Sequence, residues 1–313
     1  MNVHNFYAAG RRESQLLDAF AATVSGSTGG RLRLDVAHAN RLALDDAEAL
    51  EWLAAGKADL GLLWPVFLQR NNRELQASYV MGSARHLHDH QRAVPALEAI
   101  GGRILSEHGL VPIAFLPSPV LYISIFSKGE AVTSLSGLVG RRLRVFSEDL
   151  VPTFRRLGAD ADFIPQGELY AALETGRFDC TVYPACHTSW SVPLWRVTQH
   201  AAYLFAEALH PYLLCCSPRA WAELDDGQQA ALMDAGESIY GDFLRLSVDN
   251  SAEMDARRHL QAAGVTWHAD FSAADRLAFG DAAAHTWQAA SAAAGGRAPD
   301  NFRSVMAAMG RLV

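Results

Sequence analysis

The sequence predicts an α/β fold with two lobes, and three observations support this prediction. First, the 313 residues exceed a typical single domain of ~100–200 residues. Second, short apolar strands alternate with helices through the first half of the chain, as in a doubly wound α/β sheet. Third, no low-complexity linker divides the chain. We therefore expect two lobes that share strands rather than two domains joined once.

Apolar periodicity and turn residues define the expected elements of the first third. The segment 31–37, RLRLDVA, alternates polar and apolar residues and predicts a strand with one buried face. Glycine ends helices readily because it adopts left-handed backbone angles without steric cost. We expect a helix over 14–23 that breaks at Gly26, a strand over 31–37, a helix over 45–55 capped by Asp45 or Asp46 and ended by Gly56, and a buried strand over 60–63.

The rest of the chain continues this alternation. The expected elements are a helix over 86–99 that turns at Gly101-Gly102, strands over 111–115, 121–126 and 142–146, a helix over 151–157, strands over 162–164 and 211–216, and helices within 219–261 and from 273 onward. We expect discontinuous lobes. Lobe I comprises residues 1–120 with 211–248, and lobe II comprises residues 121–210 with 249–313.

Composition excludes several classes of protein. Half of the residues are hydrophobic and 19% are charged, which indicates a folded rather than a disordered chain. The net charge of −7 is spread along the chain without a basic run, so nucleic acid is not expected as a partner. No apolar stretch approaches the ~18–20 residues that span a bilayer, and residues 2–10 lack the hydrophobic region of a signal peptide. We expect a soluble chain without stable membrane insertion, either cytoplasmic or an exported product that begins at an artificial Met1.

Two segments invite an enzymatic interpretation. The run HLHDH at 86–90 resembles a metal-ligand cluster, but in a helix His86 and His90 share a face while His88 points away. Cys186 and His187 suggest a thiol nucleophile beside a base, although sequence neighbours seldom meet with the required geometry. A solvated helix face is favoured over a metal site. A metal- or Cys/His-dependent hydrolase stays open as the alternative function.

The cysteines give no sign of a cofactor. Cys180, Cys186, Cys215 and Cys216 show no CxxC spacing, and the adjacent pair lies in an apolar run. We expect buried free thiols rather than a disulfide framework. No metal or other cofactor is implied.

Arg144 is the residue best suited to bind a ligand. It lies inside an apolar strand, and a guanidinium drawn toward a core needs an acceptor. Its planar fork matches a carboxylate in a bidentate arrangement. The pattern alone leaves two interpretations open: a ligand carboxylate, or an exposed edge position with an internal salt bridge to Glu148 or Asp149.

Two central motifs carry a family resemblance. The segment 138–145, LVGRRLRV, is followed by 168–179, ELYAALETGRFD, and this pair resembles the DctP-type substrate-binding proteins of tripartite ATP-independent periplasmic (TRAP) transporters. In that family a DLKGxKxRV strand precedes an ELYxALQxGxVDG segment. Three flanking segments agree with the same family, at 20–32, 50–61 and 217–232. The resemblance therefore covers nearly the whole chain.

The resemblance implies a periplasmic-binding-protein-like fold. Two α/β lobes joined by crossing strands and a long helix would enclose a ligand cleft and close on the ligand. It also implies a periplasmic receptor rather than an enzyme, which delivers a small organic acid to the membrane permease subunits of a TRAP transporter. Arg144 matches the arginine that binds the substrate carboxylate in this family. A soluble sensor domain that retains the fold is a further alternative.

Further candidate ligand contacts lie at strand ends or within strands beside the expected cleft. They are Tyr183, Trp64, His210, Phe146, Asn5 and Tyr122. Sugar-acid binders of the family place Asn at the Tyr183 position, whereas Tyr offers one hydroxyl and a broad ring. The expected ligand is therefore a monocarboxylate with an apolar or aromatic body, and uronates and sialic acid are expected to bind poorly. Ser217 is expected to cap a helix rather than to contact the ligand.

Overall fold

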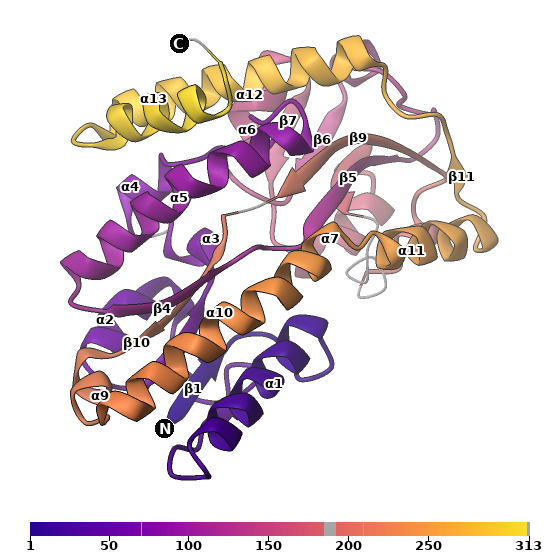
Figure 1. Ribbon diagram of the computed structural model, residues 1–313. Helices are drawn as coiled ribbons and strands as arrows, with labels where there is room; N and C mark the ends of the chain where they lie inside the picture. The colour runs from indigo at the N-terminus through magenta and orange to yellow at the C-terminus, as the bar shows by residue number, and fades with distance from the viewer. Residues whose placement is uncertain (70, 185–191, 209, 312–313) are drawn as a thin grey trace.

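The computed structural model describes residues 1–69, 71–184, 192–208 and 210–311. Two sheets form the centres of two lobes (Figure 1). The five-stranded sheet has the order β2-β1-β3-β10-β4, and the six-stranded sheet has the order β11-β9-β5-β8-β6-β7. The predicted two-lobed α/β fold is therefore confirmed.

The strands of the two sheets interleave along the chain. The five-stranded sheet contains β1 (Asn2–Asn5), β2 (Asp35–Ala37), β3 (Leu60–Leu63), β4 (Val111–Leu116) and β10 (Tyr212–Cys216). The six-stranded sheet contains β5 (Val120–Ser127), β6 (Arg142–Val145), β7 (Asp160–Phe163), β8 (Cys180–Pro184), β9 (His200–Ala208) and β11 (Thr266–Trp267). The chain thus passes from one sheet to the other between β4 and β5 and returns between β9 and β10.

Helices cover both sheets. In the first half of the chain they are α1 (Arg12–Ser27), α2 (Ala49–Ala54), α3 (Pro65–Leu68), α4 (Arg73–Gln76) and α5 (Leu87–Glu107). In the second half they are α6 (Leu150–Arg156), α7 (Gln166–Glu174), α9 (Pro218–Ala222), α10 (Asp226–Val248), α11 (Ser251–Ala262), α12 (Ala273–Ala294) and α13 (Ala298–Ala308). Short 3-10 turns lie at Asp46–Glu48, Ser136–Leu138 and Leu194–Arg196.

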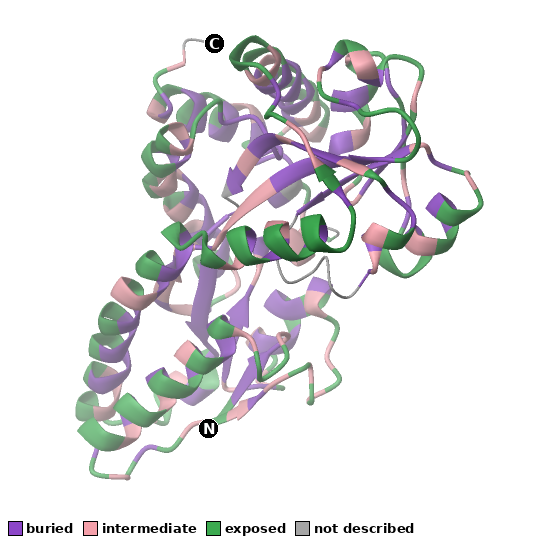
Figure 2. Cartoon of the chain, turned by 90° about the vertical axis from the view of Figure 1, so that its right-hand side faces the viewer, coloured by how far each residue is buried: buried purple, intermediate pink, exposed green. Residues whose placement is uncertain are grey.

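Strand β10 shows why the five-stranded sheet is buried on both faces. Leu213 and Cys215 belong to the core beneath α2, α5 and α13, whereas Leu214 and Cys216 belong to the core beneath α1 and α10. Successive strand residues point to opposite faces, so an uninterrupted apolar strand needs a helical layer on each side. Figure 2 shows these buried strands inside helices whose outer faces are exposed.

The C-terminal helices contact both lobes. Helix α12 packs on α6, which lies beside the six-stranded sheet, while α13 packs on α5 beside the five-stranded sheet. The expected long helix is realised as α10 followed directly by α11, with Asp249 and Asn250 between them. Asp249 forms an ion pair with Arg12 at the start of α1. The exact residue boundaries of the lobes stay a prediction.

Helix α5 is longer than predicted and runs through Gly101 and Gly102 to Glu107. The prediction that these glycines form a turn is wrong. A Cβ atom at Gly101 would lie 3.1 Å from Leu213 Cδ2, and one at Gly102 would lie 3.3 Å from Phe115 Cζ. The two glycines therefore allow close packing of the helix on the sheet.

Two smaller predictions also need correction. Helix α1 continues through Gly26 to Ser27, because the left-handed residues that end it are Gly29 and Gly30. Only Asp35–Ala37 of the predicted strand 31–37 pairs with β1. Other capping predictions are confirmed: Asp45 accepts a hydrogen bond from the Ala47 amide, and Gly56 has a φ of +69°.

Gly82 lies where the two lobes meet. Its φ of +80° suits glycine, and a Cβ atom there would overlap the ring of Phe279 on α12. Its amide donates to Glu207 Oε2 at 2.5 Å, and the neighbouring Met81 amide donates to Asp149 Oδ2 at 3.1 Å. Two carboxyl groups of the six-stranded lobe therefore hold one short segment that precedes α5.

Candidate ligand-binding site

Arg144 projects from β6 into a buried position. Its side chain is 1% exposed, and its Nε and Nη2 atoms donate to the Ile164 carbonyl at 3.2 and 2.9 Å. The neighbours Leu143 and Val145 point to the opposite face, into the core beneath α6. Nη1 is buried and has no hydrogen-bond partner in the described part of the chain. Burial lowers the pKa of Arg144 to about 10.

No carboxylate of the described residues pairs with this guanidinium. The alternative salt bridge from the sequence is not formed: Glu148 is exposed, and Asp149 accepts hydrogen bonds from Ser147 and from the Met81 amide. The positions outside the described residues, 70, 185–191, 209 and 312–313, contain neither Asp nor Glu in the sequence. Arg144 is therefore a buried cation without an acidic side chain as counter-charge.

A row of polar side chains shares the face of Arg144. In the sheet, Arg144 lies opposite Thr181, and Tyr183, two residues further along β8, lies opposite Ser124. The Arg144 Cζ atom is 5.9 Å from the centre of the Tyr183 ring. Ser124 Oγ is buried and has no hydrogen-bond partner among the described residues. The structure thus brings Arg144 and Tyr183 together and adds Ser124, which the sequence prediction missed.

Lobe I supplies an aromatic cluster at the ends of β1 and β3. The ring of Trp64 lies 6.0 Å from Phe6 in a stacked arrangement and 5.1 Å from Phe67 edge-on. Tyr7 joins the cluster, and its hydroxyl lies 2.6 Å from that of Tyr212. Trp64 packs against the cores of both lobes. Its Nε1 atom is buried and lacks a partner among the described residues.

The sequence singled out Trp64 but not its aromatic neighbours. Phe6 directly follows β1, and an aromatic residue directly after a strand was the available signal, whereas Phe67 lies within α3 and had no such signal. Such residues are common in cores, so only the folded arrangement distinguishes this cluster.

Asn5 and His210 are engaged elsewhere. Asn5 Nδ2 donates to Ser14 Oγ at 2.9 Å and lies 2.9 Å from His38 Nδ1, so it ties β1 to α1. His210 Nε2 lies 3.1 Å from Ser78 Oγ, in the junction between the lobes. Neither residue contacts Arg144 among the interactions of the described residues.

Tyr122 and Phe146 have other neighbours in the six-stranded lobe. Tyr122 lies beside Tyr203, with ring centres 6.1 Å apart, and lines a hollow of about 260 Å³ with Arg85 and Arg276. Phe146 packs against the apolar core of the six-stranded lobe. Ser217 accepts a hydrogen bond from the Ala220 amide, which confirms its predicted capping role.

The lobe junction holds a second group of buried ionisable side chains. Glu207 is 1% exposed, and burial raises its pKa well above the usual range, while the Gly82 amide opposes this shift. Burial also lowers the pKa of His90 to about 4 and that of His210 to about 3. No sequence motif linked these residues, because they come from α5, β9 and the segment that joins β9 to β10.

The described residues behind the enzymatic alternative do not form a metal-binding group. The part of the chain that the structure describes contains no group of three His, Cys, Asp or Glu placed to hold a metal ion. His86 precedes α5, and His90 is buried against Tyr79. Cys186 and His187 lie outside the described residues.

The three described cysteines are buried free thiols, as predicted. Burial raises the pKa of Cys180 to about 12, that of Cys216 to about 12, and that of Cys215 further still. Since the thiolate is the reactive form, these thiols are unsuited to nucleophilic chemistry.

Comparisons with known proteins agree on one family. The model of the DctP family, described as bacterial extracellular solute-binding protein, family 7, matches residues 4–293. A curated solute-binding protein of Chromohalobacter salexigens is 25% identical over 247 residues, which is 74% of this chain and 68% of that protein. No helix of the described residues is long and apolar enough to cross a membrane.

Two solved structures show the same fold. A TRAP periplasmic solute-binding protein from Sulfitobacter with bound β-D-galacturonate is 20% identical, with a TM-score of 0.75 over 97% of this chain and 98% of that one. A Bordetella pertussis extracytoplasmic solute receptor, DctP7, which binds pyroglutamic acid, is 19% identical, with a TM-score of 0.75 over 99% of both chains. The family consists of solute-binding receptors rather than enzymes. The chain therefore belongs to the DctP family, the family 7 bacterial extracellular solute-binding proteins.

Proposed function

We propose that this protein captures a small organic acid in the periplasm by its carboxylate, which Arg144 holds, and delivers the acid to the permease subunits of a TRAP transporter. The observation that carries this proposal is a buried guanidinium whose Nη1 atom has no partner and which no acidic side chain neutralises. Because the proteins of this family bind solutes, we infer that an anionic solute supplies the counter-charge of Arg144.

The energetics favour an anionic ligand. A buried, unpaired ion costs several kcal/mol relative to water, and a bidentate carboxylate offsets that cost through charge and through directed hydrogen bonds. Two of the guanidinium nitrogens already donate to the Ile164 carbonyl, which fixes the orientation of the fork. A pre-oriented arginine loses little side-chain entropy on binding.

The surroundings favour an acid with an apolar or aromatic body. Tyr183 places a broad ring near Arg144, and Trp64 heads the aromatic cluster on the other lobe. Hydroxyl-rich acids lose water on entering such a site, and each hydroxyl left unpaired costs about 1–3 kcal/mol. We therefore propose a compact monocarboxylate, such as a keto acid or an aromatic acid, over a uronate. The pyroglutamic acid bound by the Bordetella receptor is a compact monocarboxylic acid of this size class.

A thermal-shift screen followed by calorimetry tests the proposal. The panel contains keto acids, aromatic acids, pyroglutamate and galacturonate, each beside its neutral amide where one exists. The best ligand is then titrated into the parent protein and into Arg144→Ala, which we expect to bind more weakly by roughly 2–5 kcal/mol. Arg142→Ala is the matched control, because Arg142 lies two residues earlier on β6 but is exposed and paired with Asp179.

Melting curves of both variants establish that the fold is intact. Unchanged affinity in a folded Arg144→Ala protein contradicts the proposed carboxylate contact. Equal losses in Arg142→Ala and Arg144→Ala contradict it as well, because they indicate a general electrostatic effect.

A further inference from the structure

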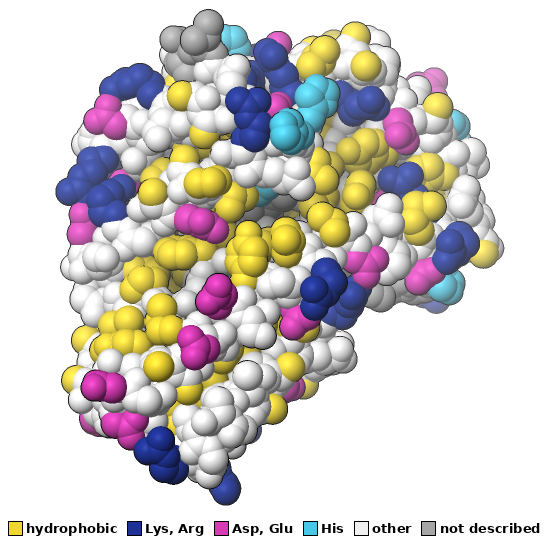
Figure 3. Space-filling view, in the orientation of Figure 1, with side chains coloured by type: hydrophobic (Ala, Val, Ile, Leu, Met, Phe, Trp, Pro, Cys, Tyr) yellow, Lys and Arg dark blue, Asp and Glu magenta, His cyan; other side chains and the backbone are white. Residues whose placement is uncertain are grey.

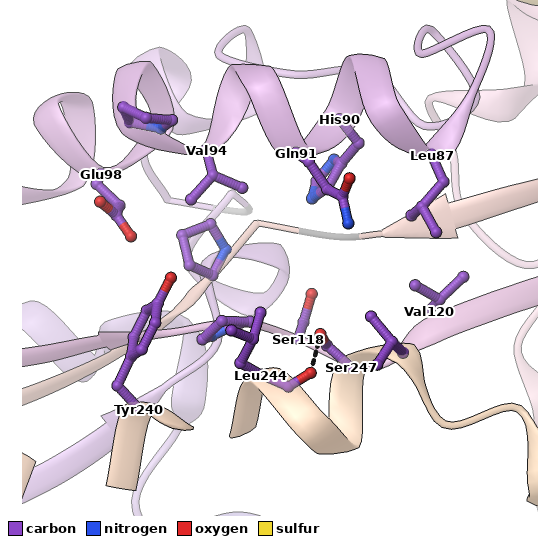
Figure 4. Close-up of a pocket in the computed structure, with 14 residues that line it drawn as sticks. Leu87, His90, Gln91, Val94, Glu98, Ser118, Val120, Tyr240, Leu244 and Ser247 are labelled. Atoms are coloured by element: carbon purple, nitrogen blue, oxygen red, sulfur yellow. Dashed lines mark hydrogen bonds between the residues drawn. The ribbon is translucent and has the colours of Figure 1, made fainter. Parts of the chain in front are cut away.

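An apolar groove lies between α5 and α10, on the side of the molecule seen in Figure 3. A band of hydrophobic side chains crosses this face, with acidic side chains among them (Figure 3). We call it the α5–α10 groove; its lining includes Leu87, Val94, Glu98, Tyr240, Leu244 and Val248. Figure 4 shows Leu87, Val94 and Glu98 projecting from α5 toward Tyr240 and Leu244 of α10.

Helix α10 exposes an apolar stripe along this groove. Met233, Tyr240, Leu244 and Val248 are 42%, 38%, 44% and 54% exposed. Their spacing of seven, four and four residues places them on one face of the helix. Large apolar side chains at that level of exposure are typical of a binding surface when they form a contiguous row.

The groove contains two hollows on either side of one carboxylate. The first hollow is about 310 Å³ in volume. Its lining includes Pro117, Val120 and Pro211, which lie where the chain passes between the two lobes. The second is about 380 Å³ and lies against Phe115 of β4. Glu98 and Tyr240 line both hollows. Each hollow can accept a large apolar side chain, with a polar position between them.

Among the described residues, the Asp, Glu, Lys and Arg side chains that line the two hollows are all acidic. They are Glu98, Asp234 and Glu237. Glu98 forms no ion pair with another described residue. A second copy of this protein would bring another acidic rim to the groove, and an anionic membrane surface would be repelled. The charge therefore favours a basic occupant.

We propose that the α5–α10 groove docks a basic, amphipathic helical segment of a partner protein. Two apolar side chains of the segment fill the hollows, and a Lys or Arg between them pairs with Glu98. This is the helix-in-groove mode, in which apolar anchors supply affinity and the charge supplies specificity. The site is separate from Arg144 and does not depend on the identity of the bound solute.

Fluorescence anisotropy with synthetic peptides tests the proposal. The probes are labelled helical peptides of about 15 residues, which match the exposed stripe at ~1.5 Å per residue. Each carries two Leu residues at helical spacing, and the residue between them is Lys in one series and Glu in the other. We expect the Lys series to bind the full-length protein and the Glu series to bind at least about tenfold more weakly.

Variants of the protein localise the binding. Leu244→Lys is expected to weaken the Lys peptides at least about tenfold, since the apolar hollow is lost. Glu98→Lys is expected to reverse the preference, so that the Glu peptides bind better than the Lys peptides. Leu277→Lys is the matched control, because Leu277 is 40% exposed on α12 and lies outside the groove. Circular dichroism melts confirm that each variant is folded.

Three outcomes overturn the proposal. The first is no binding by any Lys peptide. The second is equal binding by the parent, Leu244→Lys and Glu98→Lys proteins. The third is a dimer of the parent protein that Leu244→Lys dissociates in light scattering, because the groove is then an interface between copies of this chain.

Discussion

The two sides of the candidate site differ in how their polar groups are satisfied. On lobe I, Asn5 is hydrogen-bonded within the lobe and the Tyr7 hydroxyl meets that of Tyr212, while Trp64 Nε1 is buried without a partner among the described residues and the aromatic rings around it carry no charge. On lobe II, Arg144 Nη1 and Ser124 Oγ are buried without partners among the described residues. Under the proposed function, lobe II would select the charge of the ligand, and lobe I would provide apolar contact area to the rest of the ligand.

The largest expected effect follows from removing the ligand's charge. We expect the neutral amide of the bound acid to lose roughly 2–5 kcal/mol of binding free energy with the parent protein. With Arg144→Ala, acid and amide should bind with nearly equal affinity, because the group that distinguishes them is gone. Calorimetry of the four combinations measures this coupling. A difference between acid and amide that survives in Arg144→Ala would place charge selection elsewhere.

The next effect concerns polar acids. Replacing Tyr183 with Asn supplies an amide donor and acceptor, so galacturonate should gain about 1–3 kcal/mol for each hydroxyl that finds a partner. A competition series against the parent ligand measures the change. Tyr170→Asn is the control, because Tyr170 lies on α7 outside the row opposite β5 and β6. Tight galacturonate binding by the parent protein would overturn the proposed preference for an apolar body.

The aromatic side should contribute without regard to charge. Trp64→Ala is expected to weaken the acid and its amide by the same amount, about 1–2 kcal/mol, because buried apolar area is lost in both complexes. Trp64→Phe should retain most of the affinity and removes the unpaired Nε1 group. If Trp64→Ala weakens binding of the acid but not of the amide, Trp64 acts on the carboxylate. That result would contradict the proposal that lobe I contributes only apolar contacts.

The smallest effect lies at the lobe junction and concerns stability. Since the pKa of Glu207 is raised in the folded protein, the folded state binds more protons, and the free energy of unfolding should fall as pH rises above about 4.5. Glu207→Gln should remove that slope and stabilise the protein at pH 7 by about 1 kcal/mol or more. Denaturant titrations between pH 5 and pH 8 measure it, with the exposed Glu174→Gln as control.

His90 and His210 impose the opposite slope at lower pH. In the folded protein the pKa of His90 is about 4 and that of His210 is about 3, both below the usual value of 6.5. Between each folded-state pKa and 6.5, the unfolded state therefore binds more protons than the folded state. Stability should therefore be lost as pH falls from about 6.5 toward 4. We expect the free energy of unfolding of Glu207→Gln to be independent of pH above about 6.5 and still to fall below about pH 6.5. This result would distinguish the contribution of Glu207 from that of the two histidines.

Local patterns in the sequence were sufficient for part of this structure. The apolar residues around Arg144 predicted a strand, and helix caps such as Ser217 were predictable because they depend on neighbouring residues. Sequence could not exclude a salt bridge from Arg144 to Asp149, since that depends on where the Met81 segment packs. Only the fold shows that it is absent.

The features that sequence reasoning missed have a common cause. The sequence placed Asn5 at a strand end, but it could not show that the Asn5 amide donates to Ser14 of α1. Ser124 was overlooked because its role depends on β8, which pairs with β5 from more than fifty residues away. Gly101 looked like a turn because the contact that requires it, Leu213, comes from the second crossing of the chain. In each case a distant segment decided the outcome.

The packing of Gly82 against Phe279 has a consequence for how this protein can vary. There is no free space between residue 82 and α12, so any side chain at this position would have to push α12 outward. The positive φ of Gly82 also disfavours any residue other than glycine. A side chain at residue 82 is therefore opposed for two independent reasons, the ring of Phe279 and the positive φ. We expect sequence variation to avoid this position, because any larger residue would displace α12 from the segment that precedes α5.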